Sequence, residues 1–198
     1  VRLDGTVIGT CTLDVAGSCD VATATMAVGN RTITAAYSGD GGHATSSGSF
    51  GQTVVAAPTT VTLTTSAPVS AVYGSTVRLS VAVDATTGTP TGTVTIREGA
   101  AVIGSCTLAT GRCDVTTATL TVGDHGLVAT YATDGNFAAS ASATLTQTIV
   151  ANGTTTTLTA IPSASSFGQT VRFRVAVAST TGVPTGTVSV SVDGSLLS

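Results

Sequence analysis

Apolar and polar residues alternate along most of this chain, which is the pattern of strands that bury one face. In the run VRLSVAV at 77–83 every second residue is Val or Leu, and the run LVATY at 127–131 alternates in a similar way. RFRVAVA at 172–178 and ITAAY at 33–37 repeat the two patterns elsewhere. A period of two with a single apolar face predicts half-buried antiparallel strands rather than helices.

Seven such runs follow one another in the middle of the chain, separated by Gly, Pro, Asp and Asn residues. Seven short strands within about 95 residues are typical of an immunoglobulin-like β-sandwich, so we expect an all-β fold. The chain has no Trp and its cysteines lie close together, which excludes the antibody arrangement of an inter-sheet disulfide over a core Trp. The expected strands are 60–66, 76–84, 92–97, 101–108, 112–119, 126–132 and 142–150.

Similar stretches recur along the chain with a period near 94 residues. The pentapeptide PTGTV starts at Pro90 and again at Pro184, and Tyr37 and Tyr131 are separated by the same 94 residues. This period is too long for a solenoid and suits a tandem array of small whole domains. We therefore expect tandem immunoglobulin-like β-sandwiches with about seven antiparallel strands in each repeat.

The threonine-rich runs TTVTL at 59–63 and TTTTL at 154–158 set the frame of the repeat. In this frame the complete repeat covers residues 59–153. Residues 1–58 match only the C-terminal half of a repeat, and residues 154–198 match only the N-terminal half. Because the two halves together make one repeat, one hypothesis is that they pair between copies of the chain that join head to tail. The alternative is that the chain is one portion of a repeating filament.

The four cysteines form two close pairs, Cys11 with Cys19 and Cys106 with Cys113. We expect each pair to bond across a hairpin, because directly opposed residues lie about 4.5 or 5.5 Å apart at Cα, within disulfide range. Closing loops this short would stabilise the fold by about 2–3 kcal/mol. Disulfides persist in oxidising surroundings, which indicates export from the cell. Zinc binding is the alternative, but the spacings are poor for zinc and the pairs lie in separate repeats.

Composition and charge exclude several functions. The chain has no Lys among its seven basic residues, which excludes a P-loop, a Schiff base and a Lys–Asn isopeptide crosslink. The net charge is −3 and the arginines are scattered, so the clustered basic footprint of a nucleic-acid-binding protein is missing. No apolar run approaches the length of a membrane-spanning helix. The chain begins VRLDG, without Met or a signal sequence, so we expect it to be a piece of a longer protein.

The complete repeat resembles the bacterial Ig-like repeat domains of group 3. The features that carry the resemblance are PTGTV before a strand, IGSCTL at 103–108, the segment ATLTVGDH at 118–125, and ATYATDGNF at 129–137. The resemblance implies a β-sandwich of secreted or surface-anchored bacterial proteins, in which such repeats form stalks of adhesins, fibres or multidomain exoenzymes. The first copy departs from the pattern, since His43 stands where the second copy has Phe137.

Few residues in the chain suggest a catalytic or metal-binding role. His43 and His125 are candidate metal ligands or bases, but neither has an acid, Cys or second His at ligand spacing, so we interpret both as loop or surface residues. Asp40, and Asp134 with Asn136, offer one or two oxygens to Ca²⁺, which takes about six to eight. We prefer an Asx-type turn as the interpretation of these residues.

Other kinds of site are also disfavoured by the sequence. It contains no G-x-S-x-G elbow, no recurring Ser/His/Asp set and no close carboxylate pair. Tyr73, Tyr131 and Phe137 could stack on sugars, although the alternation places Tyr131 in the core. NRT at 30–32 and NGT at 152–154 match the N-glycosylation pattern, and we expect them to be unmodified. The sequence therefore predicts no catalytic residue, no cofactor and no metal site.

The near-identical repeats and the short joints at 53–63 and 148–158 favour a structural role. We expect a non-enzymatic, extracellular stalk, spacer or fibre of a bacterial surface or adhesin-type protein. Its expected partners are neighbouring repeats or other copies of the chain, without nucleic acid or membrane insertion. The alternative is an accessory module of a secreted protein that binds a surface glycan or receptor. Only 4% of the residues are aromatic, which places this alternative second.

Overall fold

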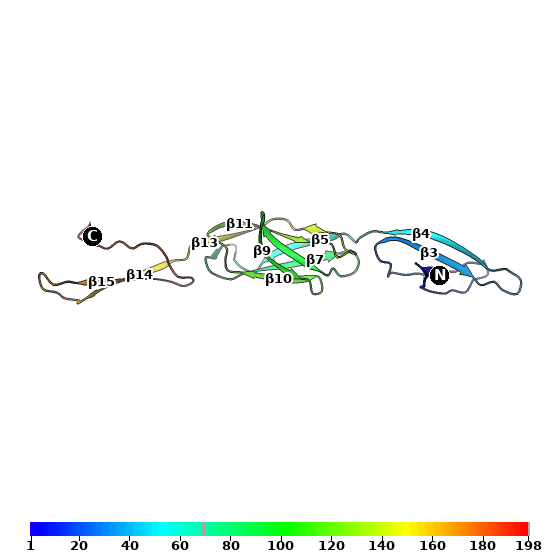
Figure 1. Cartoon of the computed structure of the whole chain (residues 1–198), viewed down its shortest axis with the longest axis horizontal. Helices are drawn as coiled ribbons and strands as arrows, with labels where there is room; N and C mark the ends of the chain where they lie inside the picture. The colour runs from blue at the N-terminus through cyan, green and yellow to red at the C-terminus, as the bar shows by residue number, and fades with distance from the viewer. Residues whose placement is uncertain (69, 198) are drawn as a thin grey trace.

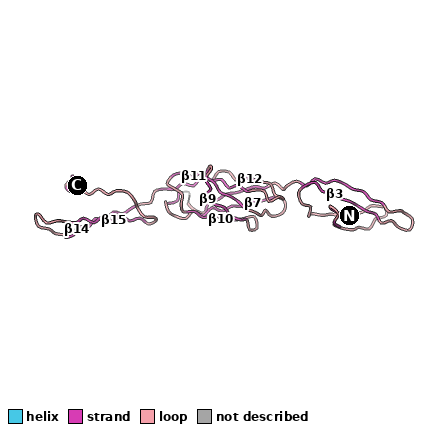
Figure 2. The backbone as a smooth tube through the Cα atoms, viewed as in Figure 1, coloured by secondary structure: helices cyan, strands magenta, loops and turns pink. Residues whose placement is uncertain are grey.

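The computed structural model describes residues 1–68 and 70–197, which form an elongated row of three parts (Figure 1). We call residues 1–58 the N-terminal segment, residues 59–153 the central domain and residues 154–198 the C-terminal segment. The two termini lie at opposite ends of the row. Strands and loops make up all three parts, and the described residues contain no helix (Figure 2).

The central domain is a sandwich of two sheets. In one sheet β7 lies between β5 and β10, antiparallel to both. The other sheet has the order β6-β13-β11-β8-β9, with β6 parallel to β13 and β12 paired to β11. The strands are β5 (Thr59–Thr65), β6 (Ser70–Val72), β7 (Val77–Ala85), β8 (Thr93–Glu98), β9 (Ala101–Thr107), β10 (Arg112–Thr117), β11 (Gly123–Tyr131), β12 (Ser140–Ala141) and β13 (Leu145–Val150). The all-β sandwich and each of the seven expected strands are confirmed, while β6 and β12 were not expected.

The alternation seen in the sequence builds the core between these two sheets. Along β7 the four apolar residues are buried, and Arg78 between them is exposed. Leu127 and Tyr131 of β11 approach from the opposite sheet and are fully buried. Removal of this apolar surface from water is the main source of stability. The buried apolar cluster consists of Val61, Leu63, Ala71, Val77, Leu79, Val81, Val83, Val94, Ile96, Leu108, Val115, Leu120, Leu127, Ala129, Tyr131 and Ile149.

The N-terminal segment forms a single sheet in the order β2-β1-β3-β4. β3 and β4 pair in the register of β11 and β13, so that Ile33 faces Phe50 as Leu127 faces Leu145. Among the described residues no second sheet covers this one, and Phe50 remains 64% exposed. The strands are β1 (Arg2–Leu3), β2 (Thr6–Val7), β3 (Gly29–Tyr37) and β4 (Ser46–Val54).

The C-terminal segment forms two hairpins that do not pair with each other. β14 and β15 pair in the register of β5 and β7, so that Leu158 faces Val175 as Leu63 faces Val81. The outer edge of β15 has no partner strand in the described chain, whereas the same edge of β7 pairs with β10. The strands are β14 (Thr154–Ile161), β15 (Arg172–Ser179), β16 (Ser191–Val192) and β17 (Ser195–Leu196).

Candidate functional site

The disulfide of the central domain joins its two sheets. Cys106 bonds to Cys113 with their Cα atoms 5.8 Å apart. Cys106 belongs to β9 and pairs with Val94 of β8, whereas Cys113 belongs to β10 and pairs with Val81 of β7. The expectation that the two cysteines oppose each other within one hairpin was therefore wrong. The bond crosses from one sheet to the other at the edge of the sandwich.

A tight turn between β9 and β10 explains this geometry. Ala109 and Arg112 pair across the turn, and Thr110 and Gly111 between them both have positive φ, the conformation of a two-residue type I′ turn. A side chain at Gly111 would meet the Val83 carbonyl at 2.9 Å. The strands separate directly beyond the turn, because each finds its partner in a different sheet.

The second cysteine pair lies in the N-terminal segment. Cys11 bonds to Cys19 with a Cα separation of 5.9 Å. Residues 18–23, which correspond to strand β10, form no strand here. The loop is held instead by the Asp14 carboxylate, which accepts hydrogen bonds from the backbone N–H groups of Ala16 and Ser18. The disulfide thus closes an irregular loop in this segment.

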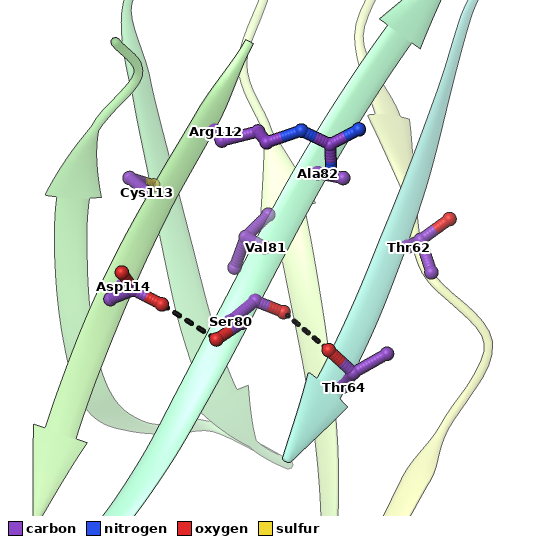
Figure 3. Close-up of a pocket in the computed structure, with 8 residues that line it drawn as sticks. All are labelled: Thr62, Thr64, Ser80, Val81, Ala82, Arg112, Cys113 and Asp114. Atoms are coloured by element: carbon purple, nitrogen blue, oxygen red, sulfur yellow. Dashed lines mark hydrogen bonds between the residues drawn. The ribbon is translucent and has the colours of Figure 1, made fainter. Parts of the chain in front are cut away.

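A polar network covers the outer face of the β5-β7-β10 sheet (Figure 3). Arg78 forms an ion pair with Asp114 at 2.6 Å, and the Ser80 hydroxyl donates to the same carboxylate. The Arg78 guanidinium, followed by the Ser80 hydroxyl, lowers the pKa of Asp114. The shallow groove on this face is lined by Thr, Ser, Arg, Asp and small residues, without an aromatic ring. The network fixes a cross-strand register and offers no stacking surface for a sugar.

His125 is a buried residue of β11, not the loop or surface residue expected from the sequence. Its side chain is only 8% exposed, and its Nδ1 lies 3.0 Å from the Glu98 carboxylate of the neighbouring strand β8. Its Nε2 donates to the Thr121 carbonyl at 2.8 Å. The Glu98 carboxylate first, and then this carbonyl, raise the pKa of His125. The pairing of β8 with β11 brings the acid to the histidine from 27 residues away, so spacing along the chain did not reveal it.

His43 also has an acidic neighbour that the sequence analysis discounted. Its Nδ1 lies 2.8 Å from Asp40, which accepts a further hydrogen bond from the backbone of Gly42. In the central domain Asp134 accepts from the backbone N–H groups of Asn136 and Phe137. Both aspartates therefore form the expected Asx-type turns. Within residues 1–68 and 70–197, no group of three or more His, Cys, Asp or Glu side chains is placed to hold a metal ion.

The joint between the N-terminal segment and the central domain is tied by backbone pairing. Only four residues separate β4 from β5. The Ala57 N–H donates to the Asn136 carbonyl at 2.8 Å, and the Ala57 carbonyl accepts from the Ala138 N–H at 2.9 Å. The ring of Phe137 packs beside Gly88, where an added Cβ would lie 3.0 Å from it. Residues of both parts line a hollow at this joint: Met26, Val28, Val54, Val55, Gly88 and Phe137 are among them.

The joint between the central domain and the C-terminal segment is tied by a side chain. Three residues separate β13 from β14, and Asn152 is one of them. Its amide N–H₂ donates to the Ser179 hydroxyl and to Thr181, and its amide oxygen accepts from the Thr180 hydroxyl. The Thr181 hydroxyl in turn donates to the Tyr73 carbonyl of the central domain. In the sequence Asn152 is recognisable only as part of a glycosylation pattern, so this role was not predicted, although a polar amide two residues before a strand was a usable signal.

The three aromatic candidates have different surroundings. Tyr131 is fully buried, as the alternation indicated, and burial followed by the Asp134 charge raises the pKa of its phenol. Phe137 packs against the core at the first joint, and Tyr73 is 46% exposed beside the second joint. The structure therefore does not gather the three rings into one surface.

Within the part of the chain that the structure describes, no helical segment has the length and hydropathy required to cross a bilayer.

Comparison with known proteins identifies the central domain. No curated protein matches the chain. A family model for the bacterial Ig-like domain (group 3) matches residues 63–150, which extend from within β5 to the end of β13. The matched residues contain strands of both sheets, all of the buried apolar cluster except Val61, and the inter-sheet disulfide described above. The central part of this chain is thus a bacterial Ig-like domain of group 3.

Proposed function

We propose that this chain is an extracellular structural module that serves as a stalk or spacer in a bacterial surface protein. The bacterial Ig-like family supports a non-catalytic structural role, and the two disulfides support an oxidising compartment. The observation that carries the proposal is that both joints are short and tied by hydrogen bonds. A stalk must hold its two ends at a fixed separation, and flexible joints would let that separation vary.

The two joints restrict bending in different ways. At the first, Ala57 adds a backbone bridge beside Phe137 of the central domain. At the second, Asn152 makes hydrogen bonds to three successive residues of the chain, 179–181. Neighbouring parts with three or four connecting residues and several shared hydrogen bonds have little freedom to rotate against each other. These contacts support a stiff rod rather than a string of independent domains.

The disulfide of the central domain suits a load-bearing role. Tension applied through Thr59 and Val150, the outer ends of the domain's first and last strands along the chain, pulls on β5 and β13. The segment between Cys106 and Cys113 cannot extend while the bond is intact, and the bond holds β9 against β10 across the two sheets. The disulfide therefore limits how far the sandwich can be unravelled.

The stiffness of the joints can be measured by small-angle X-ray scattering at high dilution. We expect the wild-type chain to give the distance distribution of an extended rod. The substitution Asn152→Ala, combined with a Gly-Ser-Gly-Ser insertion after residue 152, should shorten the average end-to-end distance and broaden the distribution. Asn30→Ala is the matched control, because the Asn30 side chain accepts a hydrogen bond from the Thr53 hydroxyl within the N-terminal segment.

The stalk proposal fails if the wild-type chain already scatters as a freely jointed set of domains. It also fails if the change at Asn152 leaves the distribution as unaltered as the Asn30 control does. Binding of the wild-type chain to a glycan array would instead support the accessory-module alternative, for which the outer groove supplies no aromatic platform.

A further inference from the structure

The loop at 118–122 carries the chain of the central domain from β10 in one sheet to β11 in the other. Leu120 at its centre is buried in the core. Within the loop, Thr119 forms hydrogen bonds to Thr117, the last residue of β10. Among the described residues, the bond from His125 to the Thr121 carbonyl is the hydrogen bond that ties this loop to the sheet of β11. His125 therefore holds the loop that carries Leu120.

The imidazole of His125 lies between two groups that can only accept hydrogen bonds. Its Nδ1 is 3.0 Å from each oxygen of the Glu98 carboxylate, and its Nε2 is 2.8 Å from the Thr121 carbonyl oxygen. A neutral imidazole carries one N–H, whereas an imidazolium carries two. Both contacts are hydrogen bonds only when both nitrogens carry a proton, so the geometry requires the charged form of His125.

The charged groups around the ring favour this form. Glu98 on β8 contacts the ring, and Asp124 on β11 itself adds a second negative charge. Arg97, the basic residue of β8, is exposed on the outer face of its sheet. β13 and the loop contain no titratable residue. The Glu98 carboxylate first, and then the Thr121 carbonyl, raise the pKa of His125 against the opposing effect of burial.

The N-terminal segment fills the equivalent position with a permanent cation. Arg31 of β3 donates from Nε to the Ala27 carbonyl at 2.8 Å and from Nη2 to the Val28 carbonyl at 2.6 Å. Its Nη1 lies 3.3 Å from the carboxylate of Asp4 in the neighbouring hairpin. Two different side chains thus join the same loop to an acid of the neighbouring hairpin, and both do so as cations.

Deprotonation of His125 removes one of its two contacts, and the acceptors decide which one. A neutral ring with its proton on Nε2 would turn the Nδ1 lone pair toward the negative Glu98 carboxylate. A ring with its proton on Nδ1 keeps the stronger, charge-assisted bond to Glu98 and turns Nε2 toward a neutral carbonyl. The proton is therefore lost from Nε2, and the bond that breaks is the one to Thr121.

We propose that His125 is a pH-dependent latch, in which the charged ring fastens loop 118–122 to the sheet of β11 and loss of the Nε2 proton to solvent releases the loop. Leu120 then keeps its place only by packing and by the local bonds within the loop. The latch lies next to the second joint, because Gly123 pairs with Ile149 near the end of β13. The inference goes beyond the stalk proposal, since a stalk needs no response to pH.

Solution NMR of the full chain, titrated from below to above the histidine range, tests the latch. Below the midpoint, the ¹⁵N shifts of the His125 ring should show a proton on both nitrogens, and above it a proton on Nδ1 alone. The methyl signals of Leu120 and the amide signals of residues 119–122 should change with the same midpoint. Because the pKa of His125 is raised in the folded chain, that midpoint should lie above about pH 6.5, the ordinary value for histidine.

Three variants separate the latch from a merely structural histidine. His125→Arg copies Arg31, and its loop signals should stay fixed across the titration because arginine keeps its charge. Glu98→Gln keeps an acceptor beside Nδ1 but removes its charge, so the ring midpoint and the Leu120 transition should move to lower pH together. Asp124→Asn is the matched control, because it removes an acid that contacts neither ring nitrogen, and it should shift the midpoint less than Glu98→Gln does.

Leu120 signals that stay constant while the ring titrates would overturn the proposal. So would a ring that keeps its Nε2 proton above the midpoint, or a loop transition that persists unchanged in His125→Arg. If His125→Arg does not fold, Glu98→Gln decides: a Leu120 transition that does not follow the ring midpoint contradicts the latch. The scattering experiment on the Asn152 variant, made at one fixed pH, tests the stalk proposal separately.

Discussion

Strands β7 and β15 carry the same alternating pattern and pair with their preceding strands in the same register, yet they have different surroundings. In β7 the inward residues are covered by the opposite sheet, and Leu79 is fully buried. In β15 no opposite sheet is present within the described chain, and Phe173 remains exposed. The two strands show that register and burial have different requirements. Local pairing sets the register of a hairpin, whereas burial of its apolar face requires strands from the other half of a sandwich.

The N-terminal segment and the central domain differ also at one charged position. Arg31 of β3 corresponds to His125 of β11, and each donates to a backbone carbonyl of the preceding loop, at Ala27 and Thr121 respectively. Each also pairs with an acid of the neighbouring strand region, Asp4 for Arg31 and Glu98 for His125. The same position therefore carries a basic side chain in both parts of the chain. Only the central domain has a histidine there, a residue type that titrates near neutral pH.

The largest expected effect comes from truncating the inward position of β7. Leu79→Ala removes a fully buried side chain and leaves a cavity, so it should lower the free energy of unfolding of the central domain by about 2–5 kcal/mol. Phe173→Ala, the matched change in β15, should cost less than about 1 kcal/mol in the dilute monomer because that face is open. Urea unfolding followed by circular dichroism measures both. A similar cost at the two positions would mean that β15 is buried in solution.

Removal of the central disulfide should have the next largest effect. Replacing Cys106 and Cys113 together by Ser frees a short loop in the unfolded chain and should lower the stability of the central domain by about 2–3 kcal/mol. The same change at Cys11 and Cys19 is the control, since that loop lies outside the sandwich. Hydrogen exchange of β9 and β10 locates the loss. If both double variants leave the central domain equally stable, the inter-sheet bond has no stabilising role.

The smallest expected effect is the pH dependence due to His125. Because the pKa of His125 is raised in the folded state, its protonated form stabilises the domain. This contribution is fully present below about pH 6.5, the ordinary histidine value, and is lost as the pH rises through the higher pKa of the folded state. The melting temperature should fall across that window in the wild type and change less in His125→Gln. An equal fall in both would assign the pH dependence to another group.

The sequence predicted the positions of strands well, and it predicted contacts between residues far apart in the chain poorly. The alternation located the seven main strands and placed Tyr131 in the core, because period and parity are properties of adjacent residues. It assigned His125 to a loop or the surface, because the partner Glu98 reaches it only through the pairing of β8 with β11. It paired Cys106 with Cys113 inside one hairpin, because nothing near the turn reveals that the flanking strands enter different sheets.

The sequence by itself determined the seven main strands of the central domain, the repeat of about 94 residues and the proximity of each cysteine pair. These follow from short-range constraints: side-chain period, turn residues such as Gly111, and separation along the chain. The tertiary structure decided which faces are covered, that a disulfide links two sheets, and that Asn152 ties the second joint. Those features depend on contacts between residues that are far apart in the chain and meet only when the sheets pack. The alternation of apolar and polar residues does not indicate which distant residues will meet.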